Sequence, residues 1–395
     1  MRKKYTVEQD AVLSQEDHRR RAIELYKQDW KVSDICLALG CSRSWFYKWL
    51  NRYKTEDGTW YQSESRVPKT IHRSLDPQME QLIIDTRKKL MASRFSQYGP
   101  QAIYYNLAQQ GYEPPPVWSI AKVLSRHQLV RKSNKAGYTS KGKKYPYQYA
   151  LCHQMDYVGP RYLSCKARYY FLTLIDSDTH WAQTGVLKNQ TSISACHQLI
   201  RFWKAVGPPD FLQMDNELAF WGSVRVPGAV GKVIRLSLSL EVTPVFIPQA
   251  EPWRNGIIER FNNTMQGHLL DTHYATVDEL QQAALHFDEI HNQSHHYSTQ
   301  NGLTPIAAAK RFHYPLRALD TSFVMPDKPI PLESGEIHVI RFVRSDLKFN
   351  IFGLSFPMPE RAKYEYILGV IIVEQQRIVL YIDQEYLIDF PFVLS

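Results

Sequence analysis

Three acidic residues stand out in the sequence because each one interrupts or ends an apolar run. Asp156 lies inside the strand-like segment HQMDYVG, Asp215 ends the segment FLQMD, and Glu259 lies on a helical segment in NGIIERFNN. A carboxylate is costly to bury unless it is paired or bound to a metal ion. If the three groups converge, they form a hard, oxygen-rich pocket that suits Mg²⁺ or Mn²⁺ and the in-line transfer of a phosphoryl group. Spacing alone leaves open the alternative of three separate structural acids.

The elements predicted around these acids form a mixed α/β core. Runs rich in Val, Ile, Leu, Tyr and Phe predict strands over QMDYVGP, ARYYFLTLID, FLQMD and VTPVFIP. Helical patterns cover residues 192–206, 256–271 and 277–293. Three consecutive strands followed by alternating helices and strands are typical of a mixed sheet covered by helices. After Ala309 the sequence changes to short alternating runs, which predict a C-terminal small β-barrel of about five strands.

A helix-turn-helix is predicted near the N-terminus, after a first helix over residues 16–27. Ser33 is the expected N-cap of the pair, Gly40 permits the tight turn, and Ser42 caps the second helix. The second helix of such a pair enters the major groove of DNA by its N-terminal end, and an ordinary helical hairpin is the alternative. The expected DNA contacts at that end are Arg43, Ser44, Tyr47 and Lys48. The expected buried residues are Ile35, Leu37, Ala38, Leu39, Phe46, Trp49 and Leu50.

A second set of helices repeats this logic over residues 77–91, 101–109 and 117–126. Two tandem units would read a longer DNA site than one. The expected DNA contacts on the exposed face of the last helix are Ser119, Lys122, Ser125 and Arg126. A basic segment without acidic residues follows, in which Arg131 and Lys132 are further expected contacts and tyrosines are interleaved. Such a segment suits a linker that tracks phosphates, and a solvated tether is the alternative.

Charge and composition favour a DNA-binding protein over a membrane or secreted protein. Residues 1–150 carry a net charge of +13, whereas the remainder carries −4. A basic first third suggests that this part binds a polyanion. The longest apolar stretch, residues 367–373, is far too short to span a bilayer, and the N-terminus lacks an apolar signal region. Five scattered cysteines predict neither a disulfide framework nor a zinc knuckle, so we expect a cytoplasmic protein.

These patterns predict a multidomain chain with α-helical helix-turn-helix domains, an α/β core and a C-terminal β domain. The expected ranges are a first helix-turn-helix domain at 1–56, a linker at 57–75, a second helix-turn-helix domain at 76–130, a basic linker at 131–150, the catalytic core at 151–312 and the C-terminal β-barrel at 325–395.

At the acidic residues the chain resembles a known family. The ordered segments QMDYVGP, LIDSDTHW, MDNELAF and NGIIERFN are similar to the core of insertion-sequence DDE transposases of the retroviral-integrase superfamily. The similarity extends to the tandem helix-turn-helix units, the segment HNQSHHYSTQNGLTP and the final β domain. The resemblance implies a ribonuclease-H-like core with two Mg²⁺ or Mn²⁺ ions. Asp156 would bridge both ions, Asp215 would hold one, and Glu259 the other.

The resemblance also implies an activity and its partners. The expected reaction is 3′-end cleavage of a mobile element followed by strand transfer, on double-stranded terminal repeats and target DNA. A homo-oligomer, a dimer or a tetramer, in a bacterial cytoplasm at the nucleoid is expected. Relatives carry a basic residue where Gln266 stands, so Arg254 and Arg260 are the expected substitutes for that DNA contact. The alternatives are a sequence-specific DNA-binding regulator with an inactive core, and a nuclease that cuts without joining.

The third acid of the triad requires a choice between two glutamates. Most relatives place about 35 residues between the second and third acids, a spacing that selects Glu251, whereas 43 residues precede Glu259. We choose Glu259, because Glu251 precedes a proline in a loop expected to be mobile, whereas Glu259 lies on an anchored helix. An insertion around residues 222–232 would explain the extra length. Asp176, Asp178 and the histidines His291, His295 and His296 are expected to be structural, and Asn216 to position a phosphate or a water molecule.

Overall fold

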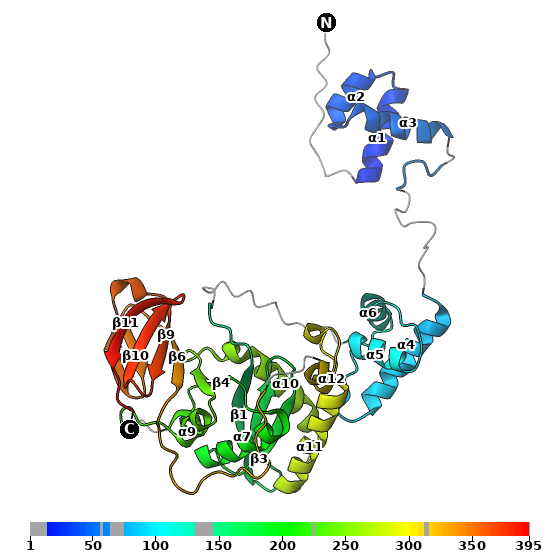
Figure 1. Cartoon of the computed structure of the whole chain (residues 1–395). Coiled ribbons are helices and arrows are strands. Elements are labelled where there is room, and N and C mark those ends of the chain that lie inside the picture. Colours follow the sequence, from blue (N-terminus) through cyan, green and yellow to red (C-terminus); the bar gives the residue numbers. More distant parts are fainter. Residues whose placement is uncertain are drawn as a thin grey trace. The chain divides into compact units, whose positions relative to one another are not determined.

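The structure is a computed structural model of the chain, and it describes residues 14–55, 58–63, 75–130, 145–222, 226–311 and 316–394 (Figure 1). Two compact units divide the chain, Met1–Leu75 and Asp76–Ser395. The second set of helices therefore shares a unit with the residues that follow it, instead of forming a unit of its own. Within the described ranges, no helix is both long and apolar enough to cross a bilayer.

The first unit contains the predicted helix-turn-helix. Its helices are α1 (Gln15–Lys27), α2 (Val32–Leu39) and α3 (Arg43–Thr55). Gly40 ends α2 in the left-handed conformation, with φ of 61°, and the Ser42 hydroxyl accepts a hydrogen bond from the Trp45 amide at 3.1 Å. The expected turn and cap are therefore confirmed. The predicted N-cap of α2 is wrong, because that helix begins at Val32 with Lys31 as its cap, so Ser33 lies inside the first turn.

The small core of the first unit confirms most of the expected apolar face. Ile35, Phe46, Trp49 and Leu50 are buried, but Leu37 is 85% exposed and Ala38 is exposed as well. Leu37, two positions after Ile35, points away from it on the helix, so the prediction that all four apolar residues of α2 are buried was wrong.

Part of the expected first linker folds back onto the first three helices. The Trp60 ring packs edge-on against Tyr53 at 5.3 Å, and the Arg19 guanidinium donates to the Tyr61 carbonyl at 2.6 Å. Arg20 lies over the Tyr61 ring at 3.7 Å. Residues 58–63 therefore belong structurally to the helix-turn-helix.

The second set of helices is part of the larger unit. It consists of α4 (Pro77–Ala92), α5 (Pro100–Gln109) and α6 (Val117–Arg126). Phe95, between α4 and α5, packs edge-on against Phe287 at 5.6 Å, and its carbonyl is 2.8 Å from Nε2 of His295. The Tyr105 ring stacks on His296 at 4.1 Å. These contacts attach the set to the core.

A mixed sheet forms the centre of the larger unit. Its first strands are β1 (Cys152–Tyr162), β2 (Arg168–Asp176), β3 (Ala182–Leu187), β4 (Phe211–Met214) and β5 (Thr243–Phe246). Strand β2 lies between β1 and β3 and is antiparallel to both, whereas β4 is parallel to β1 and to β5. This order and the flanking helices confirm the ribonuclease-H-like α/β core.

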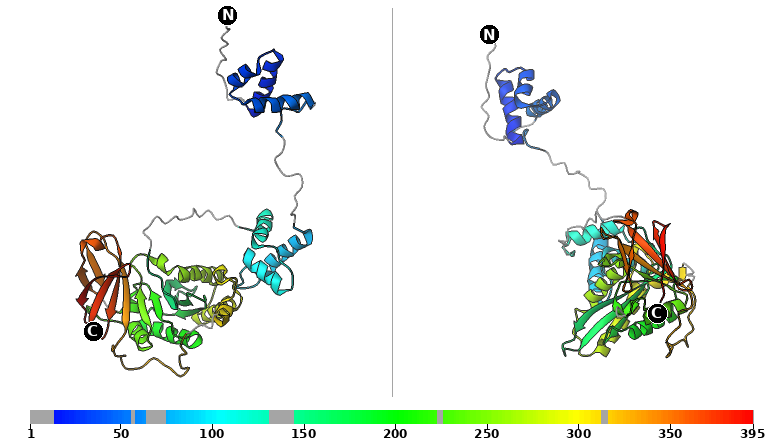
Figure 2. Two further views of the ribbon diagram at one scale, coloured as in Figure 1. Left: turned by 45° about the horizontal axis from the view of Figure 1, so that its top comes forward. Right: turned by 90° about the vertical axis from the view of Figure 1, so that its left-hand side faces the viewer.

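Helices cover both faces of this sheet (Figures 1 and 2). One face packs against α7 (Ser192–Val206) and α9 (Lys232–Ser239), with the short α8 (Leu218–Trp221) beside them. The other face packs against α10 (Gly256–Leu269) and α11 (Val277–Ser294). Because side chains alternate along a strand, β2 sends Leu172 and Leu174 to the first core and Phe171 and Ile175 to the second. The remaining helical segments are η1 (Pro252–Asn255), η2 (Ser298–Gln300) and α12 (Pro305–Arg311).

The C-terminal strands extend the same sheet. They are β6 (Glu336–Phe342), β7 (Lys348–Ile351), β8 (Leu354–Pro357), β9 (Tyr366–Ile372), β10 (Arg377–Ile382) and β11 (Glu385–Pro391), with the short η3 (Glu360–Ala362) before β9. Strand β6 pairs with β5 in parallel, which gives a nine-stranded sheet in the described part of the chain; β7 and β8 form a separate hairpin. The predicted β-rich end is confirmed, but its strand pairing does not close into a barrel apart from the core. Strand β5 would otherwise be an open edge, and β6 covers it.

Candidate active site

Two of the three predicted carboxylates lie side by side because their strands are adjacent. Met155 of β1 is in register with Met214 of the parallel strand β4, and Asp156 and Asp215 each follow one of these methionines. Neighbouring strands are about 4.8 Å apart, so the two acids leave the sheet at the same place. One acid lies within a strand and the other just after a strand, yet both occupy equivalent positions in the sheet.

Asp156 is held from the helix side by an amide. Asn262 of α10 donates from Nδ2 to Oδ2 of Asp156 at 2.8 Å, and its Oδ1 accepts from the Thr173 hydroxyl at 2.7 Å. Thr173 is the antiparallel partner of Asp156 on β2. Sequence reasoning missed this pair, although Asn262 lies three residues after Glu259 and hence on the same helix face.

Burial and like charge both act on Asp156. Burial and, to a smaller extent, the negative charges of Asp215 and Glu259 raise its pKa to about 7, against the Asn262 hydrogen bond. The carboxylates on β4 and α10 therefore act electrostatically on Asp156. Burial also raises the pKa of Asp215 to about 6, against the hydrogen bond that its Oδ1 accepts from the Glu217 amide at 3.0 Å.

Glu259 lies in the first turn of a helix that is anchored on both sides. The Ile258 amide donates to Oε1 of Gln154 at 3.0 Å, and the side chains of Ile258 and Phe261 are buried. Gln154 lies two residues before Asp156 on β1, so it faces the same helix. This anchor places the start of α10 against the strand that carries Asp156.

Glu251, the alternative third acid, is engaged elsewhere. Both of its carboxylate oxygens accept from the Tyr366 hydroxyl of β9, at 3.0 and 2.9 Å, and Oε2 also accepts from Nε of Arg254 at 2.9 Å. The expectation of a mobile loop at this residue was wrong, because these bonds attach it to the C-terminal sheet. Glu259, and not Glu251, is among the charges that raise the Asp156 pKa.

The chemistry of the three side chains fits a hard divalent cation. All the donors are carboxylate oxygens, and the negative charges of Asp215 and Glu259 contribute to the raised pKa of Asp156, a repulsion that a bound cation would relieve. Oδ2 of Asp156 is bonded to Asn262 and Oδ1 of Asp215 to Glu217. Within the described ranges, no group of three or more His, Cys, Asp or Glu side chains is already gathered closely enough to hold a metal ion.

The predicted DNA contacts of the first unit are all accessible. Arg43, Ser44, Tyr47 and Lys48 are exposed on the N-terminal half of α3, where a recognition helix presents its side chains. In the second set, Lys122 and Ser125 are exposed and Ser119 is half-buried.

Other predicted DNA contacts in the larger unit have partners or lie outside the described residues. Arg126 donates from Nη1 to both oxygens of Glu80, at 2.9 and 2.8 Å. Arg254 is turned inward, where it bonds Glu251 and Tyr366 and lies over the Tyr145 ring at 4.2 Å. Arg131 and Lys132 lie outside the described residues.

Arg260 remains accessible on α10. It lines a cavity of about 1160 Å³ together with His180 and Tyr297, on whose pKa values its positive charge acts. Tyr145, Tyr147 and Tyr149 lie in the segment that was interpreted as a phosphate-tracking linker or a solvated tether. They border this cavity but mainly pack inward: Tyr147 is buried, and its hydroxyl donates to the Tyr366 carbonyl at 3.1 Å. The described end of that segment is therefore not a solvated tether, because these tyrosines form an apolar cluster with β5, β6 and β9.

The remaining polar candidates have structural partners. Asp176 accepts from the Thr179 hydroxyl at 2.8 Å, and Asp178 accepts from the Leu151 amide at 2.8 Å. Ring nitrogens of His291, His295 and His296 lie within hydrogen-bond distance of backbone carbonyls. The Asn216 amide group bonds protein atoms on both sides, so it is not available to position a phosphate as expected.

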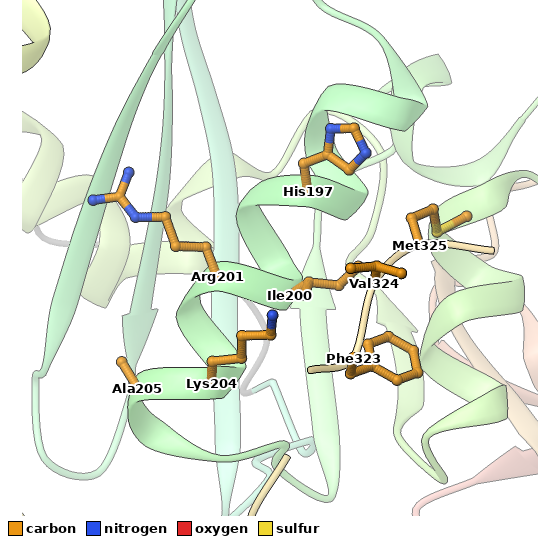
Figure 3. A pocket seen from close by; sticks show the side chains of 8 residues that line it. All are labelled: His197, Ile200, Arg201, Lys204, Ala205, Phe323, Val324 and Met325. Carbon is orange, nitrogen blue, oxygen red and sulfur yellow. The ribbon is translucent and has the colours of Figure 1, made fainter. Parts of the chain in front are cut away.

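A second cavity, of about 570 Å³, lies on the outer face of α7. Figure 3 shows His197, Arg201 and Lys204 on that helix beside the extended segment that carries Phe323, Val324 and Met325. No carboxylate lines this cavity, and α7 packs on the face of the sheet opposite α10. It is therefore not the candidate active site.

Comparison with known proteins finds two domain families in the chain. Residues 14–59 match the homeodomain-like domain, and residues 240–305 match the integrase core domain. The second match covers β5, α10 with Glu259, and α11.

Similar solved structures include retroviral integrases. The HTLV-2 integrase catalytic core domain in complex with magnesium is 20% identical with a TM-score of 0.30, over 40% of this chain and 94% of that one. The catalytic core domain of BIV integrase is 14% identical with a TM-score of 0.32, over 42% and 98%. The simian T-cell lymphotropic virus intasome, in complex with a PP2A regulatory subunit, is 16% identical with a TM-score of 0.36, over 75% and 97%.

Proposed function

We propose that this chain, a member of the integrase and transposase superfamily in which a homeodomain-like domain precedes an integrase core domain, is a DNA transposase of the DDE type. Its reaction is cleavage at the 3′ ends of a mobile element followed by transfer of those ends into target DNA. The observation that carries the proposal is the register of β1 with β4, which sets Asp156 beside Asp215, while Gln154 of β1 bonds the start of α10, the helix that carries Glu259. Acidic side chains brought together on adjacent elements in this way are typical of functional sites.

The three carboxylates would hold two divalent ions, Mg²⁺ or Mn²⁺, with Asp156 shared between them. When bound, such ions supply Lewis-acid stabilisation of the attacking and leaving oxygens of a phosphodiester. Adjacent parallel strands fix Asp156 and Asp215 on a rigid support. Asn262 orients Oδ2 of Asp156, and the Glu217 amide orients Oδ1 of Asp215. Gln154 of β1 anchors the start of α10, the helix that carries Glu259.

Exposed polar and basic residues are proposed to bind DNA. The N-terminal half of α3 would read the terminal repeat through Arg43, Ser44, Tyr47 and Lys48, while Lys122 and Arg260 would contact phosphates. The proposed organisation keeps the second set of helices at 76–130 and the core at 151–312, and it extends the first helix-turn-helix domain from 1–56 to residue 63. The proposed active form is a homo-oligomer that pairs two DNA ends.

A strand-transfer assay tests the proposal. The full chain, Mg²⁺ and labelled DNA fragments from either side of its own gene are mixed with a supercoiled plasmid. We expect joined products that disappear in Asp156→Asn and Asp215→Asn. Cleaved DNA without joined products would replace the transposase by a nuclease. Binding without any chemistry in Mg²⁺ or Mn²⁺ would indicate a regulator instead.

The two glutamates supply a matched pair of variants for the third position. Glu259→Gln is expected to reduce joined product on the order of 10²- to 10³-fold, because it would remove one carboxylate ligand of the divalent ions that stabilise charge in the transition state. Glu251→Gln keeps a hydrogen-bonding group opposite Tyr366 and is expected to retain activity. Full activity in Glu259→Gln together with loss in Glu251→Gln would move the third acid to Glu251.

A further inference from the structure

A buried arginine from the C-terminal strands reaches the turn that carries the second carboxylate. Arg341 lies on β6 and is 9% exposed, and burial lowers the pKa of its guanidinium to about 10, so it stays charged at neutral pH. Its guanidinium donates to neutral groups: Nη2 donates to Oδ1 of Asn216 at 2.7 Å, and the other nitrogens donate to the carbonyls of Ile247, Ile340 and Asn350. Asn216 directly follows Asp215.

The same asparagine is also bonded to the neighbouring strand of the core. Its Nδ2 donates to the Ile247 carbonyl at 2.7 Å, and that carbonyl also accepts from Nη1 of Arg341 at 3.2 Å. The Ile247 amide in turn donates to the Met214 carbonyl at 3.1 Å. Asn216, Ile247 and Arg341 therefore close a three-membered node across the ends of β4, β5 and β6.

The node fixes the backbone on both sides of Asp215. Before it, Met214 is bonded to Ile247; after it, Asn216 is fixed through its side chain, and its carbonyl accepts from Nε1 of Trp221 at 3.1 Å. A guanidinium has five donors in a rigid fork, so it can hold an amide and several carbonyls in one geometry. A lysine at this position would keep the charge but could not reproduce that fork.

The geometry of this node points to Arg341 as a positioning residue that acts through Asn216 on Asp215 and so tunes the affinity of the carboxylates for a divalent ion. The inference rests on the proposed function, because it presumes that Asp215 is a metal ligand. It also makes the C-terminal strands part of the active site, since β6 supplies the arginine. Outer contacts of this kind orient ligands, and their loss weakens metal binding on the order of 10- to 100-fold.

The test measures metal binding directly, without DNA. Free Mn²⁺ is titrated by electron paramagnetic resonance in the presence of the full chain, its Asn216→Ala variant and its Arg341→Lys variant. Each variant is expected to bind Mn²⁺ about 10-fold more weakly than the parent chain. The double variant is expected to lose no more than the larger single effect, because both changes break one node.

Arg235→Lys is the matched control. Arg235 of α9 also donates to backbone carbonyls, those of Val230 and Ile330. This control is expected to bind Mn²⁺ like the parent chain. Thermal unfolding without metal is recorded for every variant to show which of them fold. If Arg341→Lys fails to fold, the Mn²⁺ affinity of Asn216→Ala, a change at a half-buried residue, tests the positioning role.

The outcomes separate the two proposals. Parental Mn²⁺ affinity in folded Asn216→Ala, or losses that add in the double variant, would overturn the positioning role while leaving the carboxylate site intact. If Asp156→Asn binds as much Mn²⁺ as the parent chain, the proposed carboxylate site itself fails. Weaker binding in the two node variants but not in Arg235→Lys supports the positioning role.

Discussion

Two sets of three helices occur in this chain, and similar local sequence leads to different surroundings. In α1–α3 the polar residues at the start of the last helix are exposed, and the set is enclosed by its own residues 58–63. In α4–α6 the loop residue Phe95 and the α5 residue Tyr105 contact the core. Arg126, on the last helix of this set, is paired with Glu80.

The difference shows that a helix-turn-helix pattern predicts local structure but does not predict whether the helices bind DNA or support a neighbouring domain. Caps, turns and apolar spacing are local, so they are the same whether a set reads DNA or supports a neighbouring domain. What the set does depends on which face is covered by the rest of the molecule. The first set is therefore proposed as the main reader of DNA sequence, and the second as a support that also carries Lys122 near DNA.

The largest expected effect is on the attachment of the second set. Phe95→Ala removes a ring that is 2% exposed and packs against Phe287 and His286, at centroid distances of 5.6 and 5.5 Å. The expected loss is about 3–5 kcal/mol in the free energy of unfolding, because truncating a buried aromatic side chain leaves a cavity. Urea denaturation of the full chain, followed by circular dichroism, measures it in the transition of the Asp76–Ser395 unit.

Trp118→Ala is the matched control for that change. Trp118 lies on α6 and is 57% exposed, so its removal is expected to change the free energy of unfolding by less than about 0.5 kcal/mol. A Phe95→Ala loss no larger than that of Trp118→Ala would mean that the second set is not supported by the core, and the contrast between the two sets would disappear.

The second expected effect depends on pH. His295 is buried against the second set, and burial lowers its pKa from 6.5 to about 4. Since the unfolded chain takes up this proton below about pH 6.5 and the folded chain does not, the stability associated with neutral His295 is present above that pH and falls as pH decreases toward 4. Between pH 7 and 5 the expected loss is about 2 kcal/mol.

A difference between two variants isolates this contribution. Burial raises the pKa values of the carboxyls Asp176 and Asp288 to about 6 and about 7. The folded chain therefore takes up these protons more readily than the unfolded chain, so acidification increases stability through these two groups. His295→Gln lacks the titrating ring but keeps the same carboxyls. The parent chain is therefore expected to lose more stability than His295→Gln between pH 7 and 5. Equal slopes for the two proteins would show that His295 does not titrate as proposed.

Local structure was largely predictable from the sequence. The ends of α6 and α7 match the expected ranges, since capping and apolar period are encoded locally. The pairing of β6 with β5 was not predictable, because the sequence of a strand does not specify which other strand it pairs with. For the same reason the segment before β1 was interpreted as a linker or a solvated tether, although Tyr147 is buried against β9.

The acids of the candidate site could be selected from the sequence, but the residues that contact them could not. Acids within apolar runs are conspicuous, so Asp156 and Asp215 could be selected from the sequence alone. Asn262 and Arg341 could not, because an asparagine on a helix and an arginine in a strand are ordinary residues until the fold places them beside an acid or its turn. The distinction between the two glutamates also required the partners of Glu251.

The smallest expected effect is on DNA affinity, and it is measured by comparing two arginines, Arg43 on α3 and Arg126 on α6. Arg43 is exposed at the start of α3, and Arg43→Ala is expected to weaken binding to the element end about 10-fold, equivalent to about 1.4 kcal/mol. Arg126 is already bonded to Glu80, so a contact with phosphate would have to replace an existing ion pair, and Arg126→Ala is expected to change affinity by less than about threefold. Fluorescence anisotropy with labelled end fragments and with a scrambled duplex, at one fixed salt concentration, measures both affinity and specificity.

A larger loss of affinity in Arg126→Ala than in Arg43→Ala would reverse the roles of the two sets of helices. Equal losses on end and scrambled DNA would reduce Arg43 to a phosphate contact, because only a base contact distinguishes one sequence from another.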